Sequence, residues 1–311
     1  MLSLLRRLKL SYAVYNVFQR RRLAHNLPIY QKLGLSKRYF SPISSRDFAG
    51  LPTNAGLPAV LPLAERLAAT PAFAAQPAAS QASLRAFEDQ GFAILPGFFS
   101  SDTVDGINQE LHQLIASQEI SVRYVNKFMF AFRKSARIRA AGEGALRELV
   151  AALLGHETKL FQSINFLTGS QQRTHSDSIH MSTFPLGGMA AAWVALEDIT
   201  PDNGPLHYYP GSHQLPYYLN ADYQNEGTEW LIGDKAYTEY EAYINQKILE
   251  AGIPKQVFLA RKGDVFIWHA NLIHGGEPHL DKFQTRKSMV FHYFSQGHIC
   301  YHEITQRPAL L

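Results

Sequence analysis

The spacing of hydrophobic and polar positions changes near residue 156. Before it, apolar residues recur at helical spacing in the segments 101–117 and 142–155, and Ser101 or Asp102 is expected to cap the first of these helices. A buried strand, Phe92–Leu95, precedes them. After residue 156, short runs rich in β-branched and aromatic residues alternate with Gly, Pro and Asn, which is typical of antiparallel strands joined by turns. The pattern predicts helices followed by a β-barrel or sandwich.

The β-rich domain is expected to span residues 84–311. Residues 47–83 are rich in Ala and Pro and poor in charge, which predicts a linker or a loosely wrapped arm. Residues 214–255 interrupt the strand pattern with an insertion rich in tyrosine and acidic residues. Two interpretations stay open for this insertion. It is either a lid, which would favour an amphipathic or cationic substrate, or a helical excursion whose tyrosines pack on the body.

Basic residues are concentrated near the N-terminus. Residues 1–46 hold ten Lys or Arg and no Asp or Glu, whereas the net charge of the whole chain is +4. The rest of the protein is therefore mildly acidic, which argues against a nucleic-acid-binding body. In the N-terminal segment, apolar residues and Arg recur at roughly helical spacing. This amphipathic segment is expected to pack on the domain, to make a peripheral contact with a membrane or a partner, or, less favoured, to target an organelle.

The apolar runs are short and interrupted. None reaches the ~18 residues that a membrane-spanning helix needs, and Arg6, Arg7 and Lys9 break the first one, which argues against a secretory signal. We therefore expect a cytoplasmic protein. Because Cys300 is the single cysteine, no intrachain disulfide and no thiolate metal cluster can form, so any metal must be bound by His, Asp or Glu.

Two short motifs place an imidazole beside a carboxylate. In a strand, residues i and i+2 share a face, so His175 and Asp177 would project together. Downstream, a strand-like segment carries His274, and Arg286 heads a further strand-like segment. Two imidazoles and one carboxylate leave three metal sites open, the arrangement of non-haem Fe(II) oxygenases. The competing pair in His279–Asp281 lies in a predicted loop with no such residues behind it.

A larger set of motifs resembles a known family. His175-x-Asp177, Trp193, the segment 198–213, the segment around His274, and Arg286 closely resemble the phytanoyl-CoA dioxygenase family of Fe(II)/2-oxoglutarate-dependent oxygenases, over about residues 84–300. The resemblance implies a double-stranded β-helix, which is a cupin-like jelly roll, with flanking helices. It also implies that His175, Asp177 and His274 are the iron ligands and that Arg286 anchors the 2-oxoglutarate carboxylate beside Trp193.

One position departs from the family pattern. Many members carry a Ser two residues after the distal His, where this chain has Gly275-Gly276. Asp177 is present, and members that halogenate replace this carboxylate with a small residue, so hydroxylation is expected. The resemblance therefore implies a dioxygenase that uses Fe(II), 2-oxoglutarate and O2 to hydroxylate a small or lipid-like organic substrate, with release of succinate and CO2.

Two other functions stay open. A non-catalytic jelly-roll binding module would keep the ligands and recognise a partner, and a zinc-dependent hydrolase would use the same three donors but leave Arg286 without a role. Further residues are expected near the co-substrate or the pocket: Gln162, Thr174, Lys127, Asn165 and Arg133. His180 is expected in a turn or the substrate pocket, whereas structural roles are expected for His207, His213, His269 and His292.

Overall fold

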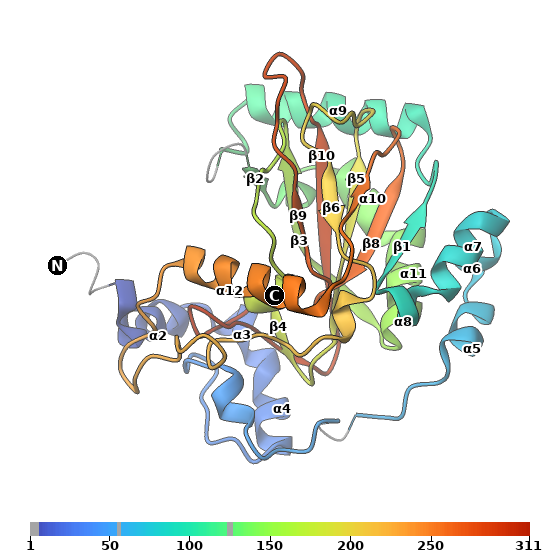
Figure 1. Ribbon diagram of the computed structural model, residues 1–311. Helices are drawn as coiled ribbons and strands as arrows, with labels where there is room; N and C mark the ends of the chain where they lie inside the picture. The colour runs from blue at the N-terminus through green and yellow to red at the C-terminus, as the bar shows by residue number, and fades with distance from the viewer. Residues whose placement is uncertain (1–5, 55–56, 123–126) are drawn as a thin grey trace.

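Three antiparallel sheets form the centre of the computed structural model, which describes residues 6–54, 57–122 and 127–311 (Figure 1). The largest sheet has the strand order β1-β8-β5-β10-β3-β2, the second β7-β6-β9 and the third β12-β11-β4. The strands are β1 Phe92–Leu95, β2 Lys127–Met129, β3 Thr158–Phe166, β4 Ser182–Phe184, β5 Met189–Ala195, β6 Leu206–Tyr208, β7 Gln256–Phe258, β8 Val265–His269, β9 His274–Gly276, β10 Ser288–Ser295, β11 Ile299–His302 and β12 Arg307–Pro308.

Strand β5, at the centre of the large sheet, is apolar and buried at every position, and its neighbour β8 is apolar except for His269. Trp193, Phe266 and Trp268 point to one face, where they pack with residues of the second sheet. Ala192 and Ile267, their alternate neighbours, point to the other face and pack with helices. Two facing antiparallel sheets with helices on the outside are the architecture that the sequence predicts.

Helices α9 Ser101–Ala116, α10 Ala136–Glu143 and α11 Ala145–Leu154 cover the outer face of the large sheet. The cap of α9 is Ser100, whose side chain accepts a hydrogen bond from the N–H of Thr103, so the prediction of Ser101 or Asp102 is wrong by one residue. The helix predicted over 142–155 is split, because Gly144 separates α10 from α11. Gly155 ends α11 with a left-handed backbone, as glycine permits.

The segment predicted as a linker contains packed helices: α5 Leu63–Ala68, α6 Pro71–Ala74 and α7 Ala78–Arg85, followed by α8 Phe87–Gln90. The predicted boundary at residue 84 therefore falls within α7. Leu63, Leu67 and Phe73 are buried in the same core as α9–α11. Arg66 donates to the carbonyl of Leu153 (2.8 Å), so it satisfies one of the carbonyl groups that have no partner within α11. The high alanine content of this segment predicted little burial, although its few large apolar residues pack in the core.

The basic N-terminal segment packs on the domain through α2 Lys9–Val17, α3 Arg20–Leu23 and α4 Leu27–Lys32. Tyr30 and Ile43 are buried against residues of β4 and β11. On the outer face of α2, Leu10, Val14 and Phe18 are exposed. Contact of this face with a membrane or a partner stays a prediction. Within the described residues, no helix is both long and apolar enough to cross a membrane.

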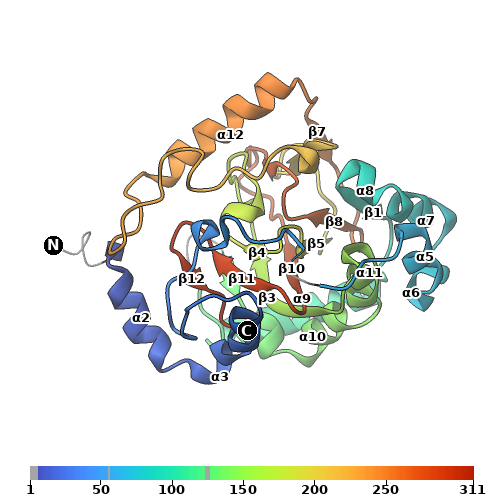
Figure 2. The same ribbon diagram turned by 90° about the horizontal axis from the view of Figure 1, so that it is seen from below.

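The insertion forms α12 Tyr237–Ala251, which lies on the opposite side of the large sheet from α10 and α11 (Figure 2). Tyr240, Ile244 and Ile248 are buried with Tyr223 and Ile273. Most of the apolar surface of α12 is therefore used in packing on the body.

Glu303 joins three distant parts of the chain. Its carboxylate accepts hydrogen bonds from the N–H and the hydroxyl of Ser45 (3.0 and 2.7 Å) and from the N–H of Asn220 (3.3 Å). Ser45 belongs to the N-terminal segment and Asn220 to the insertion. Burial raises the pKa of this carboxyl, and the three donors act in the opposite direction.

We expect acid to destabilise the fold through buried histidines such as His298, which burial holds neutral with a pKa of about 4. The unfolded chain binds this proton near pH 6.5, so it binds more protons than the folded chain between pH 6.5 and 4. The stabilisation is complete above pH 6.5 and is lost as the pH falls toward 4.

Urea unfolding at pH 7 and pH 5 measures this loss. In His298→Gln, the loss of unfolding free energy between the two pH values should be smaller by on the order of 1 kcal/mol. His112→Gln, at an exposed helical position, should keep the wild-type loss. Equal losses in all three proteins would refute the assignment to His298.

Candidate metal centre

Reciprocal backbone pairing brings two histidines together. The N–H of His175 donates to the carbonyl of His274, and the N–H of His274 donates to the carbonyl of His175, both at 2.9 Å. Asp177 then begins a short 3-10 helix, η4 Asp177–Ile179. The expected strand is short: His175 forms a single antiparallel bridge, and the backbone of Ser176 is still extended before the 3-10 helix begins. His175 and Asp177 project together, as expected, with Asp177 Oδ1 3.7 Å from His175 Nε2 and 3.9 Å from His274 Nε2.

Hydrogen bonds fix which atoms face the shared point. Nδ1 of His175 is 2.7 Å from the carbonyl of Arg173, and Nδ1 of His274 is 2.9 Å from that of Leu272. A carbonyl only accepts, so each Nδ1 carries the proton and each Nε2 presents a lone pair. Asp177 Oδ2 accepts from the indole N–H of Trp268 (2.8 Å), which leaves Oδ1 for a metal.

The charge state of these buried groups suits a cation. Burial lowers the pKa of His274 to about 4, so its imidazole is neutral at pH 7. Burial alone would raise the pKa of Asp177, but the surrounding imidazoles and a hydrogen bond outweigh it and hold the carboxyl below its usual range. The three donor atoms lie within 4.8 Å of one another. Two imidazoles and one carboxylate in this space form a metal-ligating set.

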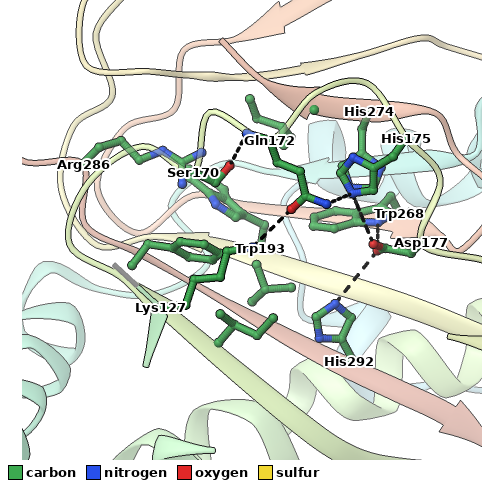
Figure 3. Close-up of a pocket in the computed structure, with 15 residues that line it drawn as sticks. Lys127, Ser170, Gln172, His175, Asp177, Trp193, Trp268, His274, Arg286 and His292 are labelled. Atoms are coloured by element: carbon green, nitrogen blue, oxygen red, sulfur yellow. Dashed lines mark hydrogen bonds and ion pairs between the residues drawn. The ribbon is translucent and has the colours of Figure 1, made fainter. Parts of the chain in front are cut away.

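A buried guanidinium occupies the other end of the same pocket. Figure 3 shows Arg286 opposite Asp177, with Gln172 and Trp193 between them. Arg286 is 2% exposed, and burial lowers its pKa to about 10, so it is charged at pH 7. It donates to the hydroxyl of Ser288 (2.6 Å), and its Cζ lies 4.9 Å from the centre of the Trp193 ring. Its Nε has no partner, and no acid of the described chain lies within ion-pair distance.

The amino-acid sequence matches a known protein family. The sequence model described as phytanoyl-CoA dioxygenase (PhyH) matches residues 87–288. The chain belongs to the phytanoyl-CoA dioxygenase family. The family prediction is thereby confirmed, and with it the prediction of an enzyme of the dioxygenase class.

Individual relatives agree with the family match. An ectoine dioxygenase of Sphingopyxis alaskensis is 26% identical over 64% of this chain and 70% of the relative. Two solved structures from nogalamycin biosynthesis are similar in fold. The carbocyclase SnoK is similar with a TM-score of 0.57 and 17% identity, and the match covers 71% of this chain and 86% of SnoK. The epimerase SnoN is similar with a TM-score of 0.55 and 22% identity, and the match covers 72% of this chain and 86% of SnoN. The predicted jelly roll is confirmed.

The pocket of this family member contains some of the predicted co-substrate residues and not others. Lys127, Trp193 and Arg286 line it. Gln162 lines a neighbouring cavity instead, and Thr174 points outward, where its hydroxyl lies 3.1 Å from Nε2 of His207. The expectation that these two residues lie beside the co-substrate is wrong, because Thr174 faces away from His175 and Gln162 lies further along β3.

The other candidates lie outside the pocket. Asn165 lies on the opposite face of β3 from the pocket residue Ile164, and Arg133 lines the neighbouring cavity. His279 makes loop contacts: its Nδ1 accepts from the N–H of Gly169 (3.1 Å), and its Nε2 donates to the carbonyl of Asp281 (2.9 Å). His180 lies near the metal centre without joining it, with its ring 6.3 Å from that of His175.

Three further residues line the pocket that the sequence did not predict there: Gln172, Trp268 and His292. The Gln172 amide lies 3.0 Å from His175 Nε2 and accepts from Lys127 (3.3 Å). His292 was expected to be structural, yet it lines the pocket, with Nε2 3.9 Å from Asp177 Oδ2 and Nδ1 without a partner. His292 follows Val290 by two residues on β10, so the two side chains share the face that lines the pocket. Val290 was not predicted to line the pocket either, so this spacing gave no usable signal.

The hydrogen bond from Trp268 to Asp177 should tune metal affinity. We expect Trp268→Phe to bind Co(II) roughly 10- to 100-fold more weakly, because loss of a partner behind a ligand typically has this effect. Titration followed by the visible Co(II) spectrum measures the change. Trp193→Phe is the matched control, since the Trp193 N–H has no partner, and its affinity should be unchanged. A similar loss in both variants would contradict the role of the Trp268 N–H.

Proposed function

We propose that this chain is an Fe(II)- and 2-oxoglutarate-dependent dioxygenase that hydroxylates a small or lipid-like organic molecule, with release of succinate and CO2. The observation that carries the proposal is one pocket with three buried metal donors at one end and a buried, unpaired guanidinium at the other. SnoN, which has a similar fold, was solved with Fe3+ and α-ketoglutarate, and this supports the proposal.

The donor set fits iron. His175, His274 and Asp177 offer three donor atoms within 4.8 Å of one another, and two imidazoles with one carboxylate are the ligand set that suits non-haem Fe(II). With iron and 2-oxoglutarate bound, the chemistry is O2 activation: one oxygen atom enters a substrate C–H bond as hydroxyl, and the other enters succinate as CO2 leaves. The three side chains hold the metal and leave positions open for the reactants.

The far end of the pocket fits the distal carboxylate of a keto diacid. Arg286 needs an anion, because a buried guanidinium without one is costly. Its contacts with Ser288 and Trp193 hold its plane in place, so that its remaining N–H groups point into the pocket. Lys127 adds a second, half-buried positive charge. The apolar walls, among them Ile164, Phe166 and Val290, exclude water from the reactants.

Arg286→Gln should weaken 2-oxoglutarate binding by roughly 100-fold, since a charge-assisted pair is worth about 3 kcal/mol. Anaerobic titration of the Fe(II) protein, followed by the weak visible charge-transfer band, gives the affinity. Arg261→Gln, at an exposed position, should behave as wild type. His175→Ala should lose both the band and succinate release on exposure to air.

The same experiment separates the other functions. A non-catalytic binding module would release no succinate, even with metal and 2-oxoglutarate bound. A zinc hydrolase would show metal-dependent hydrolysis that is indifferent to 2-oxoglutarate. Unchanged 2-oxoglutarate affinity in Arg286→Gln would overturn the assignment of this residue.

A further inference from the structure

A second cavity of about 500 Å³ lies next to the metal pocket. Two strands, β3 and β10, contribute lining residues to both of them. On β10, Val290 and His292 line the metal pocket, and Phe294, on the same face, lines the second cavity. On β3, Ile164 lines the first and Gln162 the second. The two cavities therefore follow each other along the same two strands, although no residue lines both.

A β-bulge shapes this junction. The register of β3 and β10 shifts between His292 and Tyr293, which leaves Phe161 as the extra residue. The ring of Phe161 stacks on Phe294 (4.0 Å) and lies 6.0 Å from the ring of His292. On the other side, the His180 ring lies 6.3 Å from His175 and also lines the second cavity. A molecule in this cavity would thus contact residues that touch the metal centre.

The second cavity is basic. Arg22, Arg133 and Arg307 line it, and no acidic residue does. None of the three has an acid within 4.0 Å among the residues that the structure describes. Besides burial, the proximity of Arg22 lowers the pKa of Arg133, so the two guanidiniums repel each other. Such a cluster is most favourable with an anion bound.

Two of the arginines also border a further cavity. Arg22 and Arg133 line it together with two bases, Arg139 and Lys159, and one acid, Glu143. Aromatic rings support two of the arginines of the second cavity: Arg133 lies over Phe130 (4.3 Å) and Arg307 over Tyr12 (4.4 Å). The rest of the lining includes three apolar side chains, Phe161, Met181 and Phe294, and three polar ones, Gln162, His180 and His302.

We propose that this cavity is the substrate site and that the substrate is an amphipathic organic anion. Its carboxylate or phosphate pairs with Arg22, Arg133 and Arg307, and its apolar body extends past Phe161 toward the metal centre. There one oxygen atom of O2 enters a C–H bond of the substrate, and the other enters succinate. This inference rests on the proposed function. Of the amphipathic or cationic substrate expected from the acidic insertion, it keeps the amphipathic character and replaces the positive charge, because no residue of 214–255 lines the cavity.

It also gives the basic N-terminal segment a role. Tyr15, Asn16 and Arg22 of this segment form one wall of the cavity, and Arg22 donates to the carbonyl of Leu310 (3.2 Å) in the opposite wall. The segment therefore helps to build the substrate site as well as packing on the domain.

The first test is binding to the metal-free protein, measured by calorimetry with decanoate, decyl phosphate and 1-decanol. We expect the two anions to bind and the alcohol to bind at least tenfold more weakly. Arg22→Gln and Arg307→Gln should each weaken anion binding roughly tenfold, equivalent to about 1.4 kcal/mol. Arg21→Gln, an exposed neighbour on the same helix, is the matched control and should bind as wild type.

Equal binding of decanoate and 1-decanol, or wild-type anion affinity in both arginine variants, would overturn the proposal. Circular dichroism establishes that each variant is folded, and Arg307→Gln tests the site independently if Arg22→Gln disrupts the contact with Leu310.

The second test is orientation. With Mn(II) in the metal centre, the methyl protons at the apolar end of bound decanoate should relax faster than the protons beside the carboxylate, and Zn(II) is the diamagnetic control. The reverse order would overturn the proposal. A protein that binds decanoate but never binds Mn(II) would instead refute the proposed function and leave the anion site intact, so the two failures are distinguishable.

Discussion

The reciprocal backbone pairing of His175 and His274 is the constraint on which the site depends. These residues are 99 positions apart, and two 2.9 Å hydrogen bonds hold their main chains side by side. Their rings lie 4.6 Å apart, and each Nδ1 is tied to a carbonyl two residues earlier in the chain. The imidazoles are therefore oriented by the main chain. Because these ligands are already ordered, less conformational entropy is lost when a metal binds.

Buried charge at both ends of the pocket opposes the stability of the fold. Asp177 and Arg286 are 6% and 2% exposed, and neither is neutralised by a partner of full opposite charge at hydrogen-bond distance. The jelly roll tolerates them because the large sheet is buried on both faces and packs against helices on its outer side. Iron and a dicarboxylate would relieve both ends, so binding and stability are coupled.

The predictable part of this protein is the part whose chemistry is carried by residue type and spacing. His175, Asp177, His274 and Arg286 were found in this way and Trp193 through the family resemblance, and the structure places all five in one pocket. Gln172 and Trp268 were not, because their roles arise from the residues that folding brings beside them. Gln162 was misplaced because its environment depends on how far along β3 the pocket extends, and the bulge at Phe161 leaves no sequence signal.

The substrate cavity closes through a contact between Arg22 and Leu310, which are 288 positions apart. Contacts with so large a sequence separation are slow to form. The cavity wall is built by residues from both ends of the printed sequence, whereas the three metal donors, His175, Asp177 and His274, lie between them. The wall and the metal centre thus depend on different segments of the polypeptide.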